Sequence, residues 1–154
     1  MSAPARMIGI DVGERRIGVA VSEGAVAVPL RVIEHTSRAA DVARVAAIAQ
    51  EHDARAVVVG LPLSMSGEER DQARRTRVFG EALAQALAVP VVYQDERLTS
   101  VQAGRAQAAA TAKPRRVRNA AGVHPARRRA KPRVDDVAAA IILQAYIDAH
   151  GAQG

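Results

Sequence analysis

Two short apolar runs rich in β-branched residues constrain the fold of this chain more than any other feature. The runs are "AVVVGLP" at 56–62 and "VPVVY" at 89–93. They are too short for buried helices, and they lack the alternation of apolar and polar residues that a surface strand shows. Strands of this kind are buried on both faces, as in a parallel sheet covered by helices.

The N-terminal segment adds antiparallel strands to this sheet. Strands are predicted over 7–11 and 17–22, where Ile17, Val19 and Val21 alternate with small residues. The connection at 12–16 contains Gly13, so the two strands are expected to form a hairpin. A third strand, 26–33, is expected at a sheet edge, because Pro29 cannot donate a ladder hydrogen bond.

A helix is predicted over 37–52. Ser37 is a good N-cap residue, since its hydroxyl can accept a bond from a free N–H of the first turn. The apolar residues recur at helical spacing and define one stripe: Val42, Val45, Ile48 and Ala49.

Two capping boxes predict where the next helices begin. Ser66 and Glu69 open a helix expected to end near residue 88. Its apolar stripe comprises Ala73, Thr76, Phe79, Leu83 and Leu87. Thr99 and Gln102 open a helix expected to end near residue 112.

The C-terminal part combines a loop with a final helix. Prolines and arginines predict a mobile basic loop over 113–133, and an apolar helix is predicted over 134–150. The expected fold class is α/β, with a mixed five-stranded sheet and helices on both faces. The length of 154 residues suits a single domain, expected over 1–154.

Composition excludes several kinds of chemistry. The chain has no cysteine, so disulfides, thiolate zinc sites and cysteine nucleophiles are excluded. The four histidines lack ligand spacing, and there is no Walker-type phosphate loop. The apolar runs are shorter than the ~18 residues that span a bilayer, and the N-terminus lacks the pattern of a signal peptide. A cytoplasmic protein with no membrane partner is expected.

Positive charge is concentrated in one segment. The chain has 22 Lys and Arg, 16 Asp and Glu, and a net charge of +6. Ten of the basic residues and none of the acidic ones fall within 101–133, so the rest of the chain is net negative. Such a patch attracts polyanions, which predicts contact with nucleic acid. Arginine-rich composition is the alternative explanation.

Acidic residues stand at the ends of three predicted elements. Asp11 ends the first strand, Asp95 and Glu96 follow the last strand, and Asp135 and Asp136 open the last helix. Functional sites gather at strand ends in α/β sheets. Taken singly, each acid has a simpler explanation as a turn residue or as a favourable charge at a helix N-terminus. Periodicity does not choose between the two aspartates of the helix.

If the three ends meet, their carboxylates repel one another, and a divalent cation would relieve the repulsion. Mg²⁺ binds carboxylate and phosphate oxygens, and two such ions about 4 Å apart promote phosphodiester cleavage. On this hypothesis Asp11 is a metal ligand, Gly13 permits a close turn, and Arg15 and Arg16 face phosphate. Carboxylate ligands suit Mg²⁺ and Mn²⁺ alike.

Four motifs occur in the order found in a known family. They are "GIDVGERRIGVAVS" at 9–22, "VVGLPLSMSG" at 58–67, "DERLTS" at 95–100 and "VDDVAAAIILQAYID" at 134–148. In these motifs the chain resembles the YqgF/RuvX family, RNase H-like proteins described as pre-16S rRNA nucleases and as Holliday junction resolvases. The segment between the last two motifs is longer and richer in arginine than is usual in that family.

The resemblance implies which residues carry the activity. The acids in the family's motif positions are Asp11, Glu96 and Asp135. By this resemblance they would be the catalytic residues and would bind two divalent ions, either Mg²⁺ or Mn²⁺. The residues expected to contact nucleic acid are Arg15, Arg16, Arg97, Arg115, Arg116, Arg118, Arg127, Arg128 and Arg129.

The favoured function is hydrolysis of structured RNA, at the 5′ end of pre-16S rRNA, by a monomer or homodimer. A resolvase of branched DNA is the first alternative, and it would require a two-fold dimer. A non-catalytic RNA-binding factor in ribosome assembly is the second. The ATP-binding fold of actin and sugar kinases also begins with strand–Asp–x–Gly, but the chain lacks its second domain and second phosphate loop.

Overall fold

The computed structural model describes residues 5–97 and 134–150. The elements of these ranges are β1 (Arg6–Val12), β2 (Arg16–Glu23), β3 (Val26–Glu34), α1 (Arg38–Glu51), β4 (Ala54–Leu61), α2 (Asp71–Ala86), β5 (Val91–Asp95) and α4 (Val134–His150). Their order agrees with the order predicted from the sequence. No helix in these ranges is both long and apolar enough to cross a membrane.

The five strands form one mixed sheet in the order β3-β2-β1-β4-β5. β1 pairs antiparallel with β2, and β2 pairs antiparallel with β3. β4 pairs in parallel with β1 on one side and β5 on the other. The predicted hairpin is confirmed, and so is the edge position of the strand that contains Pro29.

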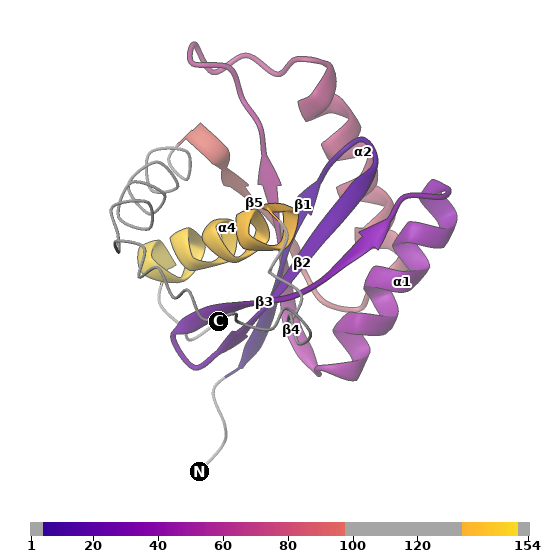
Figure 1. The fold of residues 1–154 in the computed structure, drawn as a ribbon, viewed down its shortest axis with the longest axis vertical. Helices are drawn as coiled ribbons and strands as arrows, with labels where there is room; N and C mark the ends of the chain where they lie inside the picture. The colour runs from indigo at the N-terminus through magenta and orange to yellow at the C-terminus, as the bar shows by residue number, and fades with distance from the viewer. Residues whose placement is uncertain (1–4, 98–133, 151–154) are drawn as a thin grey trace, which may run out of the picture.

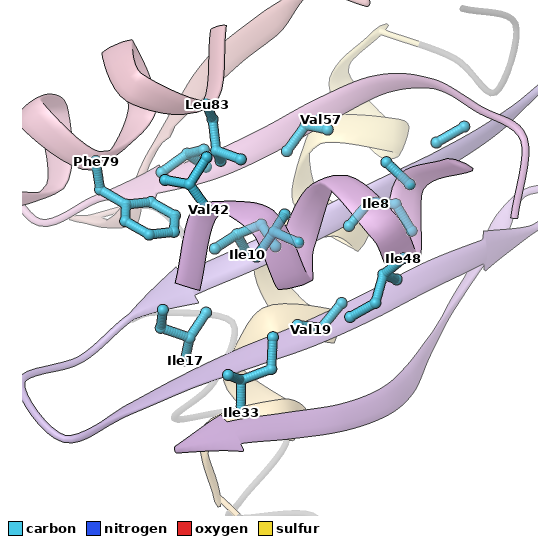
Figure 2. Close-up of a cluster of buried hydrophobic side chains, with 14 of the residues drawn as sticks. Ile8, Ile10, Ile17, Val19, Ile33, Val42, Ile48, Val57, Phe79 and Leu83 are labelled. Atoms are coloured by element: carbon cyan, nitrogen blue, oxygen red, sulfur yellow. The ribbon is translucent and has the colours of Figure 1, made fainter. Parts of the chain in front are cut away.

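Helices cover both faces of the sheet (Figure 1). α1 and α2 lie on one face, where their apolar residues meet those of the strands (Figure 2). α4 covers the other face, hereafter the α4 face, and packs on β1, β2 and β3. Val57 and Val59 of β4 belong to the first core and Val58 to the second, so this strand is buried on both faces as predicted. The predicted fold class is confirmed.

The helix cap predicted at Ser37 is present. Ser37 Oγ accepts a hydrogen bond of 3.1 Å from Ala40 N, and α1 begins at the next residue. The predicted stripe from Val42 to Ala49 is buried against the sheet. Asp41, one residue before this stripe, is also buried.

The capping box predicted at Ser66 and Glu69 is wrong. α2 begins at Asp71, because the preceding residues form a turn in which Gly67, with φ of 90°, donates from its N–H to Ser64 O. Glu69 does not reach back to a helix cap. Its carboxylate accepts a hydrogen bond of 2.7 Å from Arg77 Nε.

The strand predicted over 89–93 is displaced by two residues. β5 runs from Val91 to Asp95 and lies half-buried at the sheet edge, since β4 is its only neighbour within the described sheet. Glu96 and Arg97 are already helical, ahead of the cap predicted at Thr99. The rest of that helix and the loop predicted over 113–133 lie outside the described residues.

Two glycines allow α4 to approach the sheet closely. A Cβ atom at Gly9 would lie 2.6 Å from Leu143 Cβ and 2.9 Å from the carbonyl oxygen of Ala139. A Cβ atom at Gly60 would collide with Ile142. At Gly9 the obstructing atoms are a Cβ and a backbone oxygen of the helix, which cannot move unless the helix moves. The bare backbone at Gly9 and Gly60 therefore lets the helix sit close to β1 and β4.

We predict that Gly9→Ala destabilises the fold. The added methyl group would have to push α4 away from β1, and overpacking of this kind costs about 1–3 kcal/mol of unfolding free energy. Urea unfolding would measure the loss. Ala47→Ser on the exposed side of α1 is the control, with an expected effect within about 0.5 kcal/mol. Equal stability of the Gly9→Ala variant and the wild type would contradict the tight contact.

Candidate active site

Strand alternation places Asp11 on the α4 face. Ile8 and Ile10 of β1 point into the core beneath α1 and α2, whereas Met7 and Gly9 meet α4. Successive side chains of a strand point to opposite faces, so Asp11 follows Met7 and Gly9. It lies at the carboxyl end of β1, half-buried and one residue from the end of the strand.

Glu96 reaches the same face from the end of β5. Its Oε2 lies 2.8 Å from the point where a Cβ atom of Gly60 would stand. That point is also in contact with Ile142 of α4, so the carboxylate lies beside the helix and above β4. Any side chain at position 60 would displace Glu96, which gives Gly60 a direct role in shaping the site.

The two carboxylates interact electrostatically. Three causes together raise the pKa of Glu96 to about 7: burial is the largest, followed by the negative charges of Asp11 and then Asp95. Because β1 and β5 flank β4, the carboxyl ends of three parallel strands bring the two acids together. A cation placed between them would favour the ionised form of both.

Asp95 is held by its neighbour Arg97. Arg97 Nη2 lies 2.6 Å from Asp95 Oδ2, and Arg97 Nε lies 3.1 Å from Oδ1. The side-chain hydrogen bond from Arg97 keeps the pKa of Asp95 below its ordinary value. Arg97 N also donates to Asp95 Oδ1 at 2.9 Å, so this pair fixes the turn from which Glu96 projects.

Arg97 also reaches the loop that follows β4. Its Nη1 donates to the carbonyl oxygen of Met65 at 3.4 Å. The guanidinium group is thus already engaged within the protein, although the sequence suggested that it would contact nucleic acid. That role stays a prediction, and the structure supplies a second one in positioning the turn.

Arg15 and Arg16 lie at the exposed connection between β1 and β2, close to Asp11 in the chain. Gly13 N donates to Arg16 O at 2.9 Å, and a Cβ atom on Gly13 would lie 2.7 Å from that oxygen. Gly13 therefore permits the close turn that the sequence suggested. Arg16 Nε lies 3.4 Å from Glu34 Oε2 in an exposed ion pair.

Asp135 lies in the first turn of α4. The side chains of residues 134–136 lie outside the description, as do the arginines predicted at 115, 116, 118, 127, 128 and 129. Within the described part of the chain there is no group of three or more metal-binding side chains. Asp11 and Glu96 nevertheless fit a hard divalent cation, because both present carboxylate oxygens, and burial and then the charge of Asp11 raise the pKa of Glu96.

The structural role of one acidic residue was not predicted from the sequence. Asp41 is 1% exposed, and its carboxylate accepts hydrogen bonds from the His35 ring and from Thr36 N. Asp41 stands four residues before Val45 and seven before Ile48, so extending the buried stripe by one helical turn would have predicted its burial.

Comparison with solved structures identifies the class of fold. Thermus thermophilus RuvC, solved "in complex with Holliday junction substrate", matches with a TM-score of 0.60 at 18% identity, over 96% of this chain and 97% of that chain. A second structure of the same protein matches with a TM-score of 0.55 at 20% identity, with the same coverage. The chain has the RNase H-like fold.

Sequence comparison then gives the family. The model described as "RuvX: Holliday junction resolvase" matches residues 5–149, so the chain belongs to the RuvX family. A relative from Chloroflexus aggregans is 46% identical over 93% of both chains, and one from Myxococcus xanthus is 42% identical over 94% of this chain and 89% of its own. Both carry the name "Putative pre-16S rRNA nuclease". The resemblance seen in the four motifs is confirmed.

We predict that Glu96 makes the stability of the metal-free protein depend on pH. Between the ordinary pKa of 4.5 and the folded value of about 7, the folded protein keeps a proton that the unfolded chain releases. The free energy of unfolding therefore falls as the pH rises through this window. Glu96→Gln should remove this component, which thermal unfolding between pH 4 and 8 in EDTA would measure.

Asp11→Asn serves as the intermediate case in the same experiment. Burial is the largest cause of the shift, so removing the charge of Asp11 should reduce the pH dependence without abolishing it. Parallel stability curves for the wild type and Glu96→Gln would show that Glu96 is not buried as described.

Proposed function

We propose that this protein is a divalent-metal-dependent nuclease that hydrolyses phosphodiester bonds of structured RNA, at the 5′ end of pre-16S rRNA. The observation that carries the proposal is the pairing of Asp11 and Glu96 on the α4 face. A half-buried carboxylate whose pKa is raised by burial and then by a second carboxylate is unfavourable in a purely structural role. The cost is understandable where the pair binds a cation.

The proposed third acid is Asp135. Helical residues seven apart lie on the same side of the helix, and Asp135 is seven residues before Ile142, which contacts Gly60. Gly60 is also the residue covered by Glu96. Asp136 is seven residues before Leu143, which contacts Gly9, so spacing alone leaves both possible. The correspondence with the family's motif favours Asp135.

Asp11, Glu96 and Asp135 would hold the metal, which we propose to be Mg²⁺ or Mn²⁺, with two ions bound. When bound, such ions supply an activated water and stabilise the leaving oxygen of a phosphodiester. The role of the three acids would be to keep their carboxylate oxygens in fixed positions as metal ligands. The Asp95–Arg97 pair keeps Glu96 in place, and Ile142 of α4 packs over Gly60 beside it.

Basic residues would bind the substrate. Arg15 and Arg16 stand at the turn next to Asp11, where they can contact phosphates on either side of the cleaved bond. The ten basic residues of 101–133 would add contacts along the backbone. Contacts of this kind position the nucleic acid and do not read its sequence.

The names of the relatives favour RNA as the substrate. Eight relatives at 37–46% identity carry the name "Putative pre-16S rRNA nuclease". Branched DNA is the second candidate, supported by the description of the family model. An RNA nuclease can act as a monomer, whereas symmetric cleavage of a junction requires a two-fold dimer. The proposed location is the cytoplasm, where a ribosomal precursor would be found.

We predict that Asp11→Asn, Glu96→Gln and Asp135→Asn each abolish cleavage and leave nucleic acid binding largely intact. The three side chains hold metal, whereas most contacts with the substrate come from arginines. Cleavage of a labelled structured RNA in Mg²⁺ or Mn²⁺, with binding measured in parallel by fluorescence anisotropy, separates the two effects. Asp136→Asn is the matched control and should keep activity.

The same assay with a four-way DNA junction distinguishes the two substrates. Cleavage of RNA alone, absent from Asp11→Asn, supports the proposed function. Paired symmetric nicks in the junction would assign the enzyme to DNA recombination. Activity retained by all three acid variants would refute the site, and the absence of any cleavage that depends on Asp11 would leave a binding role.

We also predict that binding weakens steeply with salt. Each neutralised phosphate contributes a slope of about −0.7 to −0.9 in a plot of log affinity against log salt concentration. Deletion of residues 113–133, which carry nine of the basic residues, should flatten this slope. Unchanged affinity and slope after the deletion would exclude the segment from substrate binding.

A further inference from the structure

A cavity of about 750 Å³ lies on the face of the sheet opposite to α4. It is bounded by the β1–β2 turn and by the first turns of α1 and α2. Its floor is apolar and is formed by Val12, Ile17, Val78 and Phe79. Val78 is 42% exposed, so part of this floor is accessible from solvent. The volume is in the range of sites that bind small organic molecules.

The cavity lies next to the candidate active site. Val12, which lines it, directly follows Asp11, and adjacent residues of a strand point to opposite faces. The carboxylate pair and the cavity therefore lie on the two sides of the same strand end. The β1–β2 turn with Arg15 and Arg16 lies at this strand end, so an RNA strand crossing the turn would pass from one to the other.

Basic side chains surround the apolar floor. Arg38, Arg74 and Arg75 line the cavity. Arg74 pairs with Asp71 and Arg75 with Glu14, at 3.3 and 3.2 Å, and all four side chains are more than half exposed. Exposed pairs contribute little stability, so a phosphate can replace the acidic partner at small cost. Arg38 makes no ion pair with any residue of 5–97 or 134–150.

His35 adds a fixed polar group to the cavity. Its Nδ1 bonds to Asp41, a carboxylate that is 1% exposed. This bond fixes the orientation of the ring, so Nε2 is the nitrogen left to meet a ligand. No hydrogen bond to His35 Nε2 occurs within the described residues.

We propose that the cavity binds one nucleotide of the RNA strand that flanks the cleavage position. Its phosphate would lie against Arg38 and Arg74, a donor such as a ribose hydroxyl or a base amine would bond to His35 Nε2, and its base or sugar would cover the floor around Val12 and Val78. The proposal rests on the proposed function and deepens it, because it adds a second contact point that fixes where the strand enters the active site.

The test compares charge reversals at two exposed arginines of the full-length chain. Arg38→Glu should weaken binding of a long structured RNA by about tenfold and reduce the salt slope by about one. Arg55→Glu, at the amino end of β4 and therefore at the opposite end of the sheet, makes the same change in net charge and should stay within about twofold of wild type. Binding is measured in EDTA, so that cleavage does not interfere.

Two further comparisons make the result specific to the cavity. Val78→Trp fills the floor without changing the charge and should also weaken binding of the long RNA, with thermal unfolding as the check on folding. The effect of Arg38→Glu should disappear on an RNA trimmed so that the strand ends at the cleavage position, because the flanking nucleotide that would fill the cavity is then absent.

Three outcomes would overturn the inference. Long RNA bound equally by Arg38→Glu, Val78→Trp and Arg55→Glu would leave the nuclease proposal standing and exclude this contact. Calorimetric binding of AMP that Arg38→Glu abolishes, with unchanged RNA affinity, would assign the cavity to a free nucleotide. If the wild type neither binds nor cleaves RNA, the proposed function itself fails.

Discussion

The close seating of α4 on the sheet is the contact on which the candidate site depends. Gly9 and Gly60 present bare backbone to the helix, and Leu143 and Ile142 occupy the space that side chains would otherwise fill. The next residue of the helix, Gln144, adds two hydrogen bonds: it accepts from Ala27 N at 2.8 Å and donates to Ala25 O at 3.0 Å. Because Glu96 shares the contact at Gly60, the depth of the helix also sets the position of the carboxylate.

This arrangement explains why two like charges can stay close to one another. Burial beside α4 and the nearby charge of Asp11 both oppose ionisation of Glu96, so the ionised carboxylate destabilises the folded chain at neutral pH. The surrounding residues must therefore keep the Glu96 side chain in this unfavourable position. Asp95 and Arg97 do so from the opposite side of the turn, with their charges paired and their geometry fixed by hydrogen bonds.

Features that depend on the spacing of apolar residues along the chain were predictable from the sequence, whereas features that depend on packing between elements were not. The strand alternation of Ile17 to Val21 and the helical stripe from Val42 to Ala49 gave the correct elements, and Pro29 gave the correct edge. The predicted start of α2 was wrong, because the residues of the expected capping box form a turn stabilised by Gly67. Asp11 and Glu96 could be named from the motifs. That they lie on the same face of the sheet follows from the order of the strands in the sheet, which could not be predicted from the sequence.

The order of the elements along the chain has a consequence for when the site can exist. The carboxylates come from the first and the last strands in sequence, and the helix that seats them is the last element described. Proteins fold from the N-terminus during synthesis, so β1 to β5 can pair while the α4 face is still bare. Until α4 has been made and has docked, Glu96 has no cover and the proposed third acid is absent. A growing chain therefore stays incompetent for the proposed cleavage until α4 has been synthesised and has docked on the sheet.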